Sequence, residues 1–226
     1  MAVNFVQRID DSVKIRNVLA SVSDKTGLDR FIPALLKINP AVKIYSTGGT
    51  LTALRDILGM ASANLISVSD YTGQPEMQGG LVKTLDFKIY LGLLSETYNP
   101  AHGEDLKRTH GVPLDMVIVN LYPFVQTVAK RDATPEKARA NIDIGGPCMV
   151  RASAKNFLRV ASVTDPSDYD EVIKELNIGH GALSLKTRFE LAQKAFLHTA
   201  AYDTAIAAYL NGKGFADVKA CYQFAP

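Results

Sequence analysis

Residues 17–58 read NVLASVSDKTGLDRFIPALLKINPAVKIYSTGGTLTALRDIL, and they contain the same pattern twice. The apolar run Asn17–Val22 predicts a strand. A polar turn follows, and Leu28–Ile38 then places apolar residues at the three- and four-residue spacing of an amphipathic helix. Residues 42–45 predict a second strand and 50–58 a second helix. Two strand–turn–helix units in succession favour an α/β fold with parallel strands.

The rest of the chain extends this pattern. Short apolar runs at 64–68, 114–120 and 159–163 predict three further strands, and residues 166–176 and 184 to about 210 predict helices. We therefore expect a three-layer α/β/α fold with a mostly parallel central sheet and C-terminal helices. No linker or repeat divides the 226 residues, so we expect one domain, 1–226, with its core at about 17–210 and a poorly ordered tail from 211.

Composition excludes several classes of protein. A net charge of +2 gives no general attraction to nucleic acid or acidic membranes, so an anion must be bound by a local site. Cys148 and Cys221 lie far apart, and the histidines lack metal-binding spacing. We expect no metal and no other cofactor. The chain has no signal-peptide pattern and no long apolar run, which predicts a soluble, cytoplasmic protein.

Two polar turns, 23–27 and 46–50, each separate a predicted strand from a predicted helix. Loops at the carboxyl ends of parallel strands converge on one crevice, and helix N-termini attract anions through their free N–H groups. Lys25 would add a positive charge. Neither turn matches GxxxxGK[ST] or GxGxxG. Simple helix capping by Ser, Thr and Asp explains each turn almost as well.

Residues 141–156, NIDIGGPCMVRASAKN, combine an aspartate, a Gly-Gly-Pro helix start and a lysine. Asp143 and Lys155 would form a coupled pair if the chain folds back. The spacing alone instead favours an aspartate that caps the helix and a lysine on the surface. Tyr122, after the most apolar strand, lies either at the crevice mouth or in a packed corner. Lys83 alone is typical of a solvated strand.

Taken together, these motifs resemble the IMP cyclohydrolase domain of bifunctional purine-biosynthesis proteins that also carry a formyltransferase. The resemblance runs in order over residues 18–210. Its main elements are SVSDKTG at 21–27, STGGT at 46–50, SDYTG at 69–73, VKTL at 82–85, NLYPF at 120–124, IDIGGP at 142–147, AKN at 154–156 and HTA at 198–200.

The resemblance implies a methylglyoxal synthase-like fold, a homodimer, and ring closure of 5-formamidoimidazole-4-carboxamide ribonucleotide (FAICAR) to IMP with loss of water. The formyltransferase domain is absent from this sequence, so a separate formyltransferase is a possible partner. The implied catalytic residues are Lys83, Tyr122, Asp143 and Lys155. The implied substrate-binding residues are Ser23, Asp24, Lys25, Thr47, Gly48, Gly49 and Thr50 for the phosphate end, Thr84, Asn120 and Ile144 for the base or ribose, and Gly145. The N–H groups of Ile144 and Gly145 would also serve the oxyanion.

One segment departs from the family pattern Gly-Arg-Val-Lys-Thr-Leu-His-Pro-Lys-Ile-His-Gly-Gly. Leu81 replaces the arginine, Asp86 and Phe87 replace His-Pro, and Tyr90 precedes Leu91 in place of His-Gly. Leucine lacks the donors of arginine, which predicts redistributed substrate binding or altered activity. The alternatives are a non-catalytic purine-nucleotide-sensing module and a methylglyoxal synthase. NLYPF and IDIGG do not suit the latter, and a sensor would not need the catalytic set.

Overall fold

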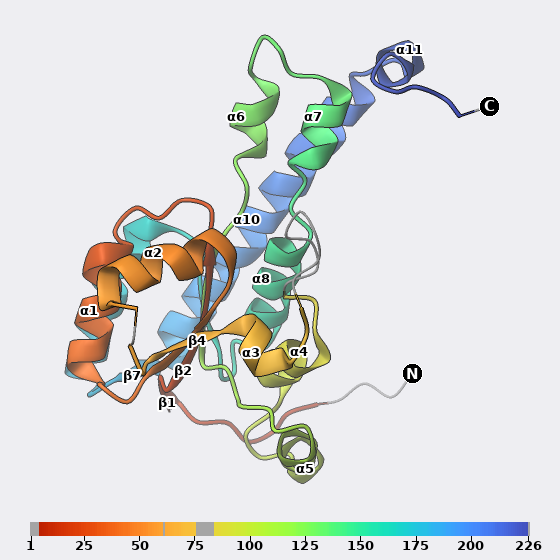
Figure 1. The fold of residues 1–226 in the computed structure, drawn as a ribbon. Coiled ribbons are helices and arrows are strands. Elements are labelled where there is room, and N and C mark those ends of the chain that lie inside the picture. Colours follow the sequence, from red (N-terminus) through yellow and green to blue (C-terminus); the bar gives the residue numbers. More distant parts are fainter. Residues whose placement is uncertain (1–4, 61, 76–83, 226) are drawn as a thin grey trace.

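Five parallel strands form the central sheet of the computed structural model (Figure 1), which describes residues 5–60, 62–75 and 84–225. Their spatial order is β4 (Leu65–Ser67), β3 (Lys43–Ser46), β2 (Asn17–Val22), β5 (Met116–Asn120) and β6 (Ala161–Val163). Each lies within two residues of a strand expected from the sequence. The mostly parallel sheet is therefore confirmed.

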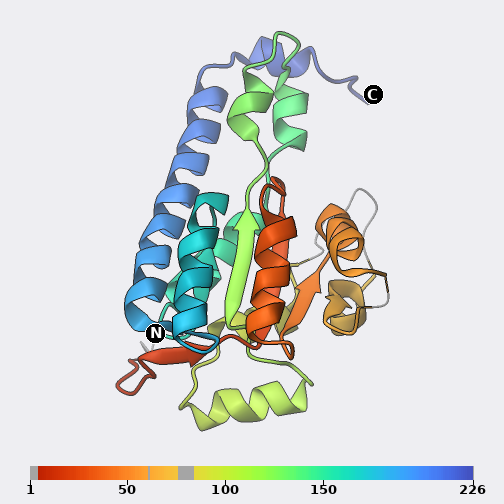
Figure 2. The ribbon, with the colours of Figure 1, turned by 90° about the vertical axis from the view of Figure 1, so that its left-hand side faces the viewer.

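Helices cover both faces of the sheet (Figures 1 and 2). In β2, Val18 and Ala20 pack into one apolar cluster, while Leu19 between them packs into the other. The first cluster is closed mainly by α1 (Leu28–Ile38), α2 (Gly48–Leu58) and α9 (Tyr169–Ile178), and the second by α3 (Val68–Thr72), α4 (Phe87–Leu94), α8 (Gly145–Lys155) and α10 (Leu185–Asn211). These are the three layers expected.

The strand order reverses between β2 and β5. From β2 the chain moves to β3 and β4 on one side, whereas β5 is followed by β6 on the other. The two strands are in register, with Val22 paired to Asn120 at their carboxyl ends. In open α/β sheets, ligands bind in the crevice outside such a reversal, because the connecting loops diverge there.

Several short elements were not expected from the sequence. β1 (Ser12–Lys14) and β7 (Ala182–Ser184) form a separate antiparallel pair. Their sequences, SVK and ALS, each lack the longer apolar run that marks β4 and β6 in the sequence. The other additions are α3, α4, α5 (Pro100–Arg108), α6 (Phe124–Val128), α7 (Pro135–Ala140) and α11 (Phe215–Lys219), and the helix expected at 166–176 begins with the 3₁₀ turn Pro166–Asp168.

The expectation of a poorly ordered tail from 211 is wrong for residues 215–219, which form α11. Gly214 precedes this helix, and its N–H donates to the Asp217 side chain. Tyr222, just beyond, donates to Glu136 of α7. With α6, α7 and the C-terminal end of α10, this helix projects beyond the sheet (Figures 1 and 2).

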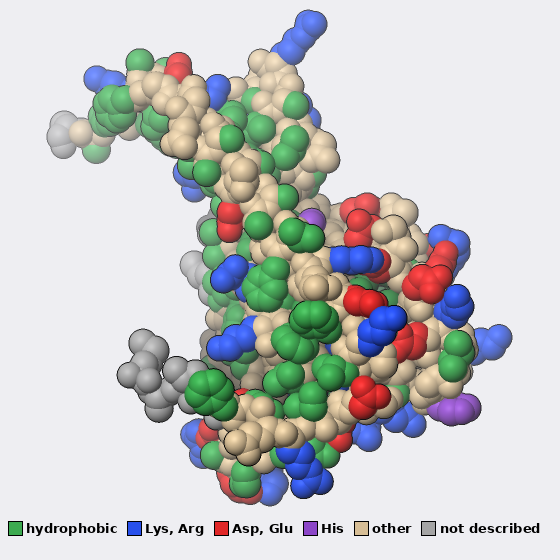
Figure 3. All heavy atoms as spheres, turned by 180° about the vertical axis from the view of Figure 1, so that it is seen from behind, with side chains coloured by type: hydrophobic (Ala, Val, Ile, Leu, Met, Phe, Trp, Pro, Cys, Tyr) green, Lys and Arg blue, Asp and Glu red, His purple; other side chains and the backbone are tan. Residues whose placement is uncertain are grey.

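The 27-residue α10 is long, but within the described residues no helix is apolar enough along its length to cross a membrane. Apolar side chains nevertheless gather on the rear face of the molecule (Figure 3). Exposed apolar residues of α10 include Phe189, Phe196 and Leu197.

Arg188 of α10 is completely buried and serves as an internal clamp. Its guanidinium donates five hydrogen bonds to backbone carbonyls of three separate segments. The acceptors are the carbonyl oxygens of Asp10, Asp11, Phe157, Leu158 and Leu183. Arg188 thus joins the N-terminal segment, the start of β6 and β7 through one side chain.

We expect Arg188→Ala to lower the free energy of unfolding by at least about 3 kcal/mol, because it leaves several buried carbonyls without a donor. Denaturant unfolding of the purified protein measures the change. Lys186→Ala on the same helix is the control; its side chain is 82% exposed, and its loss is expected to cost about 0.5 kcal/mol or less. Equal effects of the two substitutions would contradict the clamp.

Candidate functional site

A cavity of about 530 Å³ lies at the carboxyl ends of β2, β3 and β5. It brings together most of the residues expected to bind or convert substrate. The expected residues that line it are Ser23, Lys25, Thr47, Gly48, Gly49, Thr50, Thr84, Asn120, Tyr122, Asp143, Ile144 and Gly145. Residues lining it that were not expected are Ser21, Val22, Leu85, Ala140, Ile142, Gly146 and Met149.

Asn120, the last residue of β5, holds the turn that follows β2. Its Oδ1 accepts the N–H groups of Ser23 and Asp24 at 2.7 and 2.8 Å, and its Nδ2 donates to the Asp24 carbonyl. An amide has two Nδ2 hydrogens, so one is left for a ligand. The role of Asn120 in contacting base or ribose stays a prediction, and its main structural task is to fix this turn.

Asp24 does not line the cavity. Its carboxylate accepts hydrogen bonds from the N–H and hydroxyl of Thr26, and these bonds lower the pKa of Asp24. The side chain therefore stabilises the turn from its exposed side. Since Asn120 already occupies the N–H groups of Ser23 and Asp24, this turn offers a ligand less than the sequence suggested.

The second turn is the better anion site. Gly48 begins α2 with a φ of 54°, a left-handed conformation that strains most other residues. The N–H groups of Gly48, Gly49 and Thr50 have no acceptor among the residues that the structure describes, as is usual for a first helical turn. The dipole of α2 makes this end attractive to an anion.

Lys25 supplies the charge for that site. Its Nζ lies 3.9 Å from the position that a Cβ on Gly49 would occupy, so the ammonium covers the start of α2. The hydroxyl of Thr50 is not available to a ligand, because it accepts from the Val22 N–H and donates to the Val22 carbonyl. This pair of hydrogen bonds holds α2 against the end of β2.

Asp143 lies half-buried in the loop before α8. Its Oδ1 accepts the Gly146 N–H at 2.8 Å. Burial raises the pKa of Asp143, and the N–H groups of Gly146 and Tyr122 oppose this only in part. A raised pKa makes the carboxylate a stronger base, which suits it to accept a proton from a substrate. Tyr122, 48% exposed, is at the cavity mouth, the first of its two expected positions.

Lys155 is not near Asp143. α8 is an unbroken helix of 11 residues, about 16 Å long, with Asp143 before its first turn and Lys155 at its end. Lys155 is exposed and does not line the cavity. Within this chain the coupled pair is therefore wrong, and the surface lysine is correct. Asp143 is not the N-cap residue itself but precedes the N-cap Ile144, and its Oδ1 accepts the Gly146 N–H in the first turn. A catalytic role of Lys155 stays a prediction. Lys83 and Leu81 lie outside the described residues.

The start of α8 provides further donors. Thr84 is buried, and its hydroxyl lies 2.7 Å from where a Cβ on Gly145 would be, so a larger residue there would displace the Thr84 side chain. No acceptor occurs in the described part of the chain for the N–H groups of Ile144 and Gly145. These two groups are placed to stabilise negative charge beside Asp143.

The departures after Thr84 have a structural explanation. Asp86 caps α4 by accepting the Lys88 N–H, which accounts for an aspartate at this position. Phe87 is exposed at the start of the helix. The Tyr90 hydroxyl is buried beside Cys148, and this burial raises its pKa. Tyr90 therefore packs inside the molecule and does not line the cavity.

Tyr202 of α10 is a residue that sequence reasoning missed. Its hydroxyl accepts the backbone N–H of Asp143 at 2.8 Å, although 59 residues separate the two. The only signal was the general helical pattern of 184–210.

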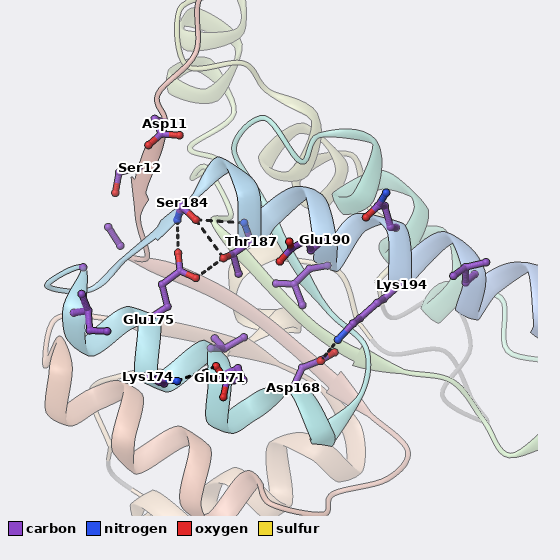
Figure 4. Close-up of a pocket in the computed structure, with 17 residues that line it drawn as sticks. Asp11, Ser12, Asp168, Glu171, Lys174, Glu175, Ser184, Thr187, Glu190 and Lys194 are labelled. Carbon is purple, nitrogen blue, oxygen red and sulfur yellow. Dashed lines mark hydrogen bonds and ion pairs between the residues drawn. The ribbon is translucent and has the colours of Figure 1, made fainter.

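A larger cavity, about 920 Å³, lies between α9 and α10 (Figure 4). None of the expected site residues lines it. Its Glu175 accepts from the Ser184 N–H and the Thr187 hydroxyl, and Asp168 pairs with Lys194. These groups serve to join the two helices. In the described parts of the chain, no group of three or more potential metal ligands occurs.

Comparison with known proteins identifies the family. The family model described as MGS-like domain matches residues 27–148, which include the turn at 46–50, Asn120 and Asp143. The chain belongs to the MGS-like domain family. A second family model, AICARFT/IMPCHase bienzyme, matches residues 153–224, the continuation of this MGS-like region. The expected methylglyoxal synthase-like fold and the resemblance to the IMP cyclohydrolase domain are confirmed.

Two curated relatives have the name Bifunctional purine biosynthesis protein PurH. The chain is 50% identical over 198 residues to that of Neisseria meningitidis and 48% identical over 197 residues to that of Ruminiclostridium cellulolyticum. Each match covers 87% of this chain but only 36% and 37% of the relatives. The solved structure entitled Crystal structure of ForH is 33% identical, with a TM-score of 0.70, and the match covers 86% of this chain and 97% of that one.

The tight packing around Asp143 predicts a contrast between two glycines. A Cβ on Gly146 would lie 2.4 Å from Asp143 Oδ2 and 2.7 Å from a methyl carbon of Leu121, whereas on Gly49 it would meet nothing closer than 3.9 Å. We expect Gly146→Ala to destabilise the protein by about 1–3 kcal/mol. Gly49→Ala is expected to be neutral or stabilising by up to about 1 kcal/mol. Urea unfolding measures the stability of both variants. If Gly146→Ala is as stable as the wild type, the close packing around Gly146 is contradicted.

The raised pKa of Asp143 predicts a stability that depends on pH. At neutral pH the ionised carboxylate is held in a buried site that disfavours it, so Asp143→Asn should raise the melting temperature. The gain should disappear as pH falls through the folded-state pKa toward 3.8, because the wild-type carboxyl then takes up its proton.

Asp24→Asn is the control with the opposite sign. The pKa of Asp24 is lowered, so its ionised form stabilises the fold at neutral pH, and that contribution is lost as pH falls below the ordinary value. Asp24→Asn should therefore lower the melting temperature at pH 7. Melting curves from pH 3.5 to 8 test both; a loss of stability in Asp143→Asn at neutral pH would contradict the assignment.

Proposed function

We propose that this chain is an IMP cyclohydrolase, which closes the ring of FAICAR to give IMP and water in purine biosynthesis. One observation carries the proposal: a single cavity has an anion site at the start of α2 and, at the start of α8, a half-buried carboxylate beside N–H donors that have no acceptor in the described part of the chain. The similarity to PurH proteins and to the bienzyme family model supports it.

Substrate orientation follows from the two ends of the cavity. The phosphate binds at the N–H groups of Gly48 and Gly49, with Lys25 above them. The imidazole ring then extends toward the Asp143 loop, where its two reacting substituents lie side by side. Because both belong to one molecule, holding them in one plane supplies much of the rate acceleration.

In the first step the carboxamide nitrogen forms a bond with the formyl carbon. An amide nitrogen is a poor nucleophile, and Asp143 accepts its proton as attack proceeds. The C=O electron pair moves to the formyl oxygen. The N–H groups of Ile144 and Gly145 stabilise that charge, and the Tyr122 hydroxyl transfers its proton to the oxygen to give a hydroxyl group.

In the second step the C–O bond breaks. Protonated Asp143 returns its proton to the departing hydroxyl, which leaves as water. The former formamide nitrogen gives its proton to the Tyr122 oxygen as the ring C=N bond forms, which restores the Tyr122 hydroxyl. The burial that raises the pKa of Asp143 suits one group to both transfers. A contribution from Lys83 or Lys155 is part of the proposal but is not needed for this proton balance.

The proposal includes the setting of the enzyme. The chain spans little more than a third of the PurH relatives, whose printed name calls them bifunctional. We place the formyl transfer that makes FAICAR outside these 226 residues, on a formyltransferase. We also propose that the protein is a homodimer located in the cytoplasm.

The direct test is to mix the purified protein with FAICAR and follow ring closure by ultraviolet absorbance. We expect turnover to IMP without added metal or nucleotide. Retained binding of IMP with no turnover would overturn the proposal in favour of a nucleotide-sensing module. Failure to bind either nucleotide would exclude both functions.

The role of Asp143 predicts a specific kinetic defect. Asp143→Asn should lower kcat about 10²- to 10⁴-fold while KM changes by only a few-fold, since the lost carboxylate accepts the proton that is transferred in the transition state. Lys174→Ala, on the exposed surface of α9, controls for mutation as such.

Lys155→Ala tests the separation along α8. It should leave the acidic limb of the pH–rate profile where it is in the wild type, because Lys155 lies too far from Asp143 to set its pKa. A shift of that limb would restore the coupled pair and contradict the geometry.

A further inference from the structure

Tyr202 of α10 contacts the loop that carries Asp143 and the start of α6, which follows the turn that carries Tyr122. The side chain is 9% exposed, in the middle of α10, and its hydroxyl accepts the Asp143 N–H and donates to the Asn141 carbonyl at 3.4 Å. Its ring packs edge-on against Phe124, two residues after Tyr122, with the centroids 6.2 Å apart. One side chain therefore contacts both the loop before α8 and the turn after β5.

We propose that Tyr202 is a positioning residue that holds the Asp143 loop and the Tyr122 turn in the arrangement required for ring closure. This inference rests on the proposed cyclohydrolase function. Tyr202 does not line the cavity, so it acts through the backbone that it binds.

The hydrogen bond fixes the group that matters most. The Asp143 carboxylate is oriented at one point by the Gly146 N–H. The Tyr202 hydroxyl fixes the backbone of the same residue at a second point. Two fixed points determine where the carboxylate lies, and a displacement of about 1 Å in such a group costs up to roughly 100-fold in rate.

The location of Tyr202 in the sequence adds to the argument. The MGS-like match ends at residue 148, whereas Tyr202 belongs to the segment matched by the bienzyme model. The MGS-like portion thus carries Asp143, and α10 supplies the contact that holds it. This explains why the long helix packs along α8.

Tyr209 offers a matched control on the same helix. It lies seven residues, about two turns, further along, and its ring also packs edge-on against Phe124, at 5.9 Å. Its buried hydroxyl, however, has no hydrogen-bond partner among the described residues. Tyr209→Phe and Tyr202→Phe remove the same atom from similar packing, but only the second removes the bond to Asp143.

The experiment measures ring closure of FAICAR by the wild type, Tyr202→Phe and Tyr209→Phe, well below their melting temperatures. We expect Tyr202→Phe to lower kcat about 10- to 100-fold with KM within a few-fold, and Tyr209→Phe to match the wild type. A merely structural role would lower the melting temperature without this change in kcat. Equal kcat for both variants would overturn the inference.

Hydrogen exchange of the Asp143 amide separates this inference from the proposed function. The amide should be protected in the wild type and in Tyr209→Phe and should exchange faster in Tyr202→Phe, whether or not FAICAR is converted. If the wild type fails to convert FAICAR, the cyclohydrolase proposal fails. If exchange at Asp143 is the same in all three proteins, the positioning role fails.

Discussion

The parallel pairing of β2 with β5 is the constraint on which the site depends. Val18 to Val22 lie in register with Met116 to Asn120, so both strands end at the same level and their following turns meet. Asn120 converts this proximity into a fixed geometry by bonding to the backbone of Ser23 and Asp24. Thr50 does the same between the end of β2 and α2. Backbone pairing and two side-chain clamps thereby determine where the anion-binding turn lies.

At the Asp143 end of the cavity, the surroundings of the carboxylate lower the stability of the fold but make the carboxylate a stronger base. Asp143 is buried enough for its pKa to rise, yet it accepts only limited hydrogen bonding. Fuller solvation would make it a weaker base, and complete burial without donors would keep it protonated. Gly146 has no room for a Cβ beside this carboxylate. The glycines of IDIGGP are thus required by the position of the base as much as by the start of α8.

The sequence was sufficient for the five sheet strands and for the turns after β2 and β3, because apolar alternation and turn residues act locally. It was insufficient where distant groups decide. The separation of Asp143 from Lys155 depends on α8 remaining unbroken, and the spacing of twelve residues was compatible with either arrangement. Asn120 was expected to face a ligand but bonds mainly to a turn almost a hundred residues earlier in the chain. Tyr202 gave no local signal, since a tyrosine on a helix usually only packs.

α10 is therefore more than a cover for the sheet. Its N-terminal part, through Arg188, binds the carbonyls of the N-terminal segment and the start of β6. Its central part, through Tyr202, binds the loop of the candidate base. A single rigid helix with both contacts couples the integrity of the fold to the position of the reacting group. The part of the chain that precedes α10 has the crevice and the anion site, and α10 completes the arrangement around Asp143.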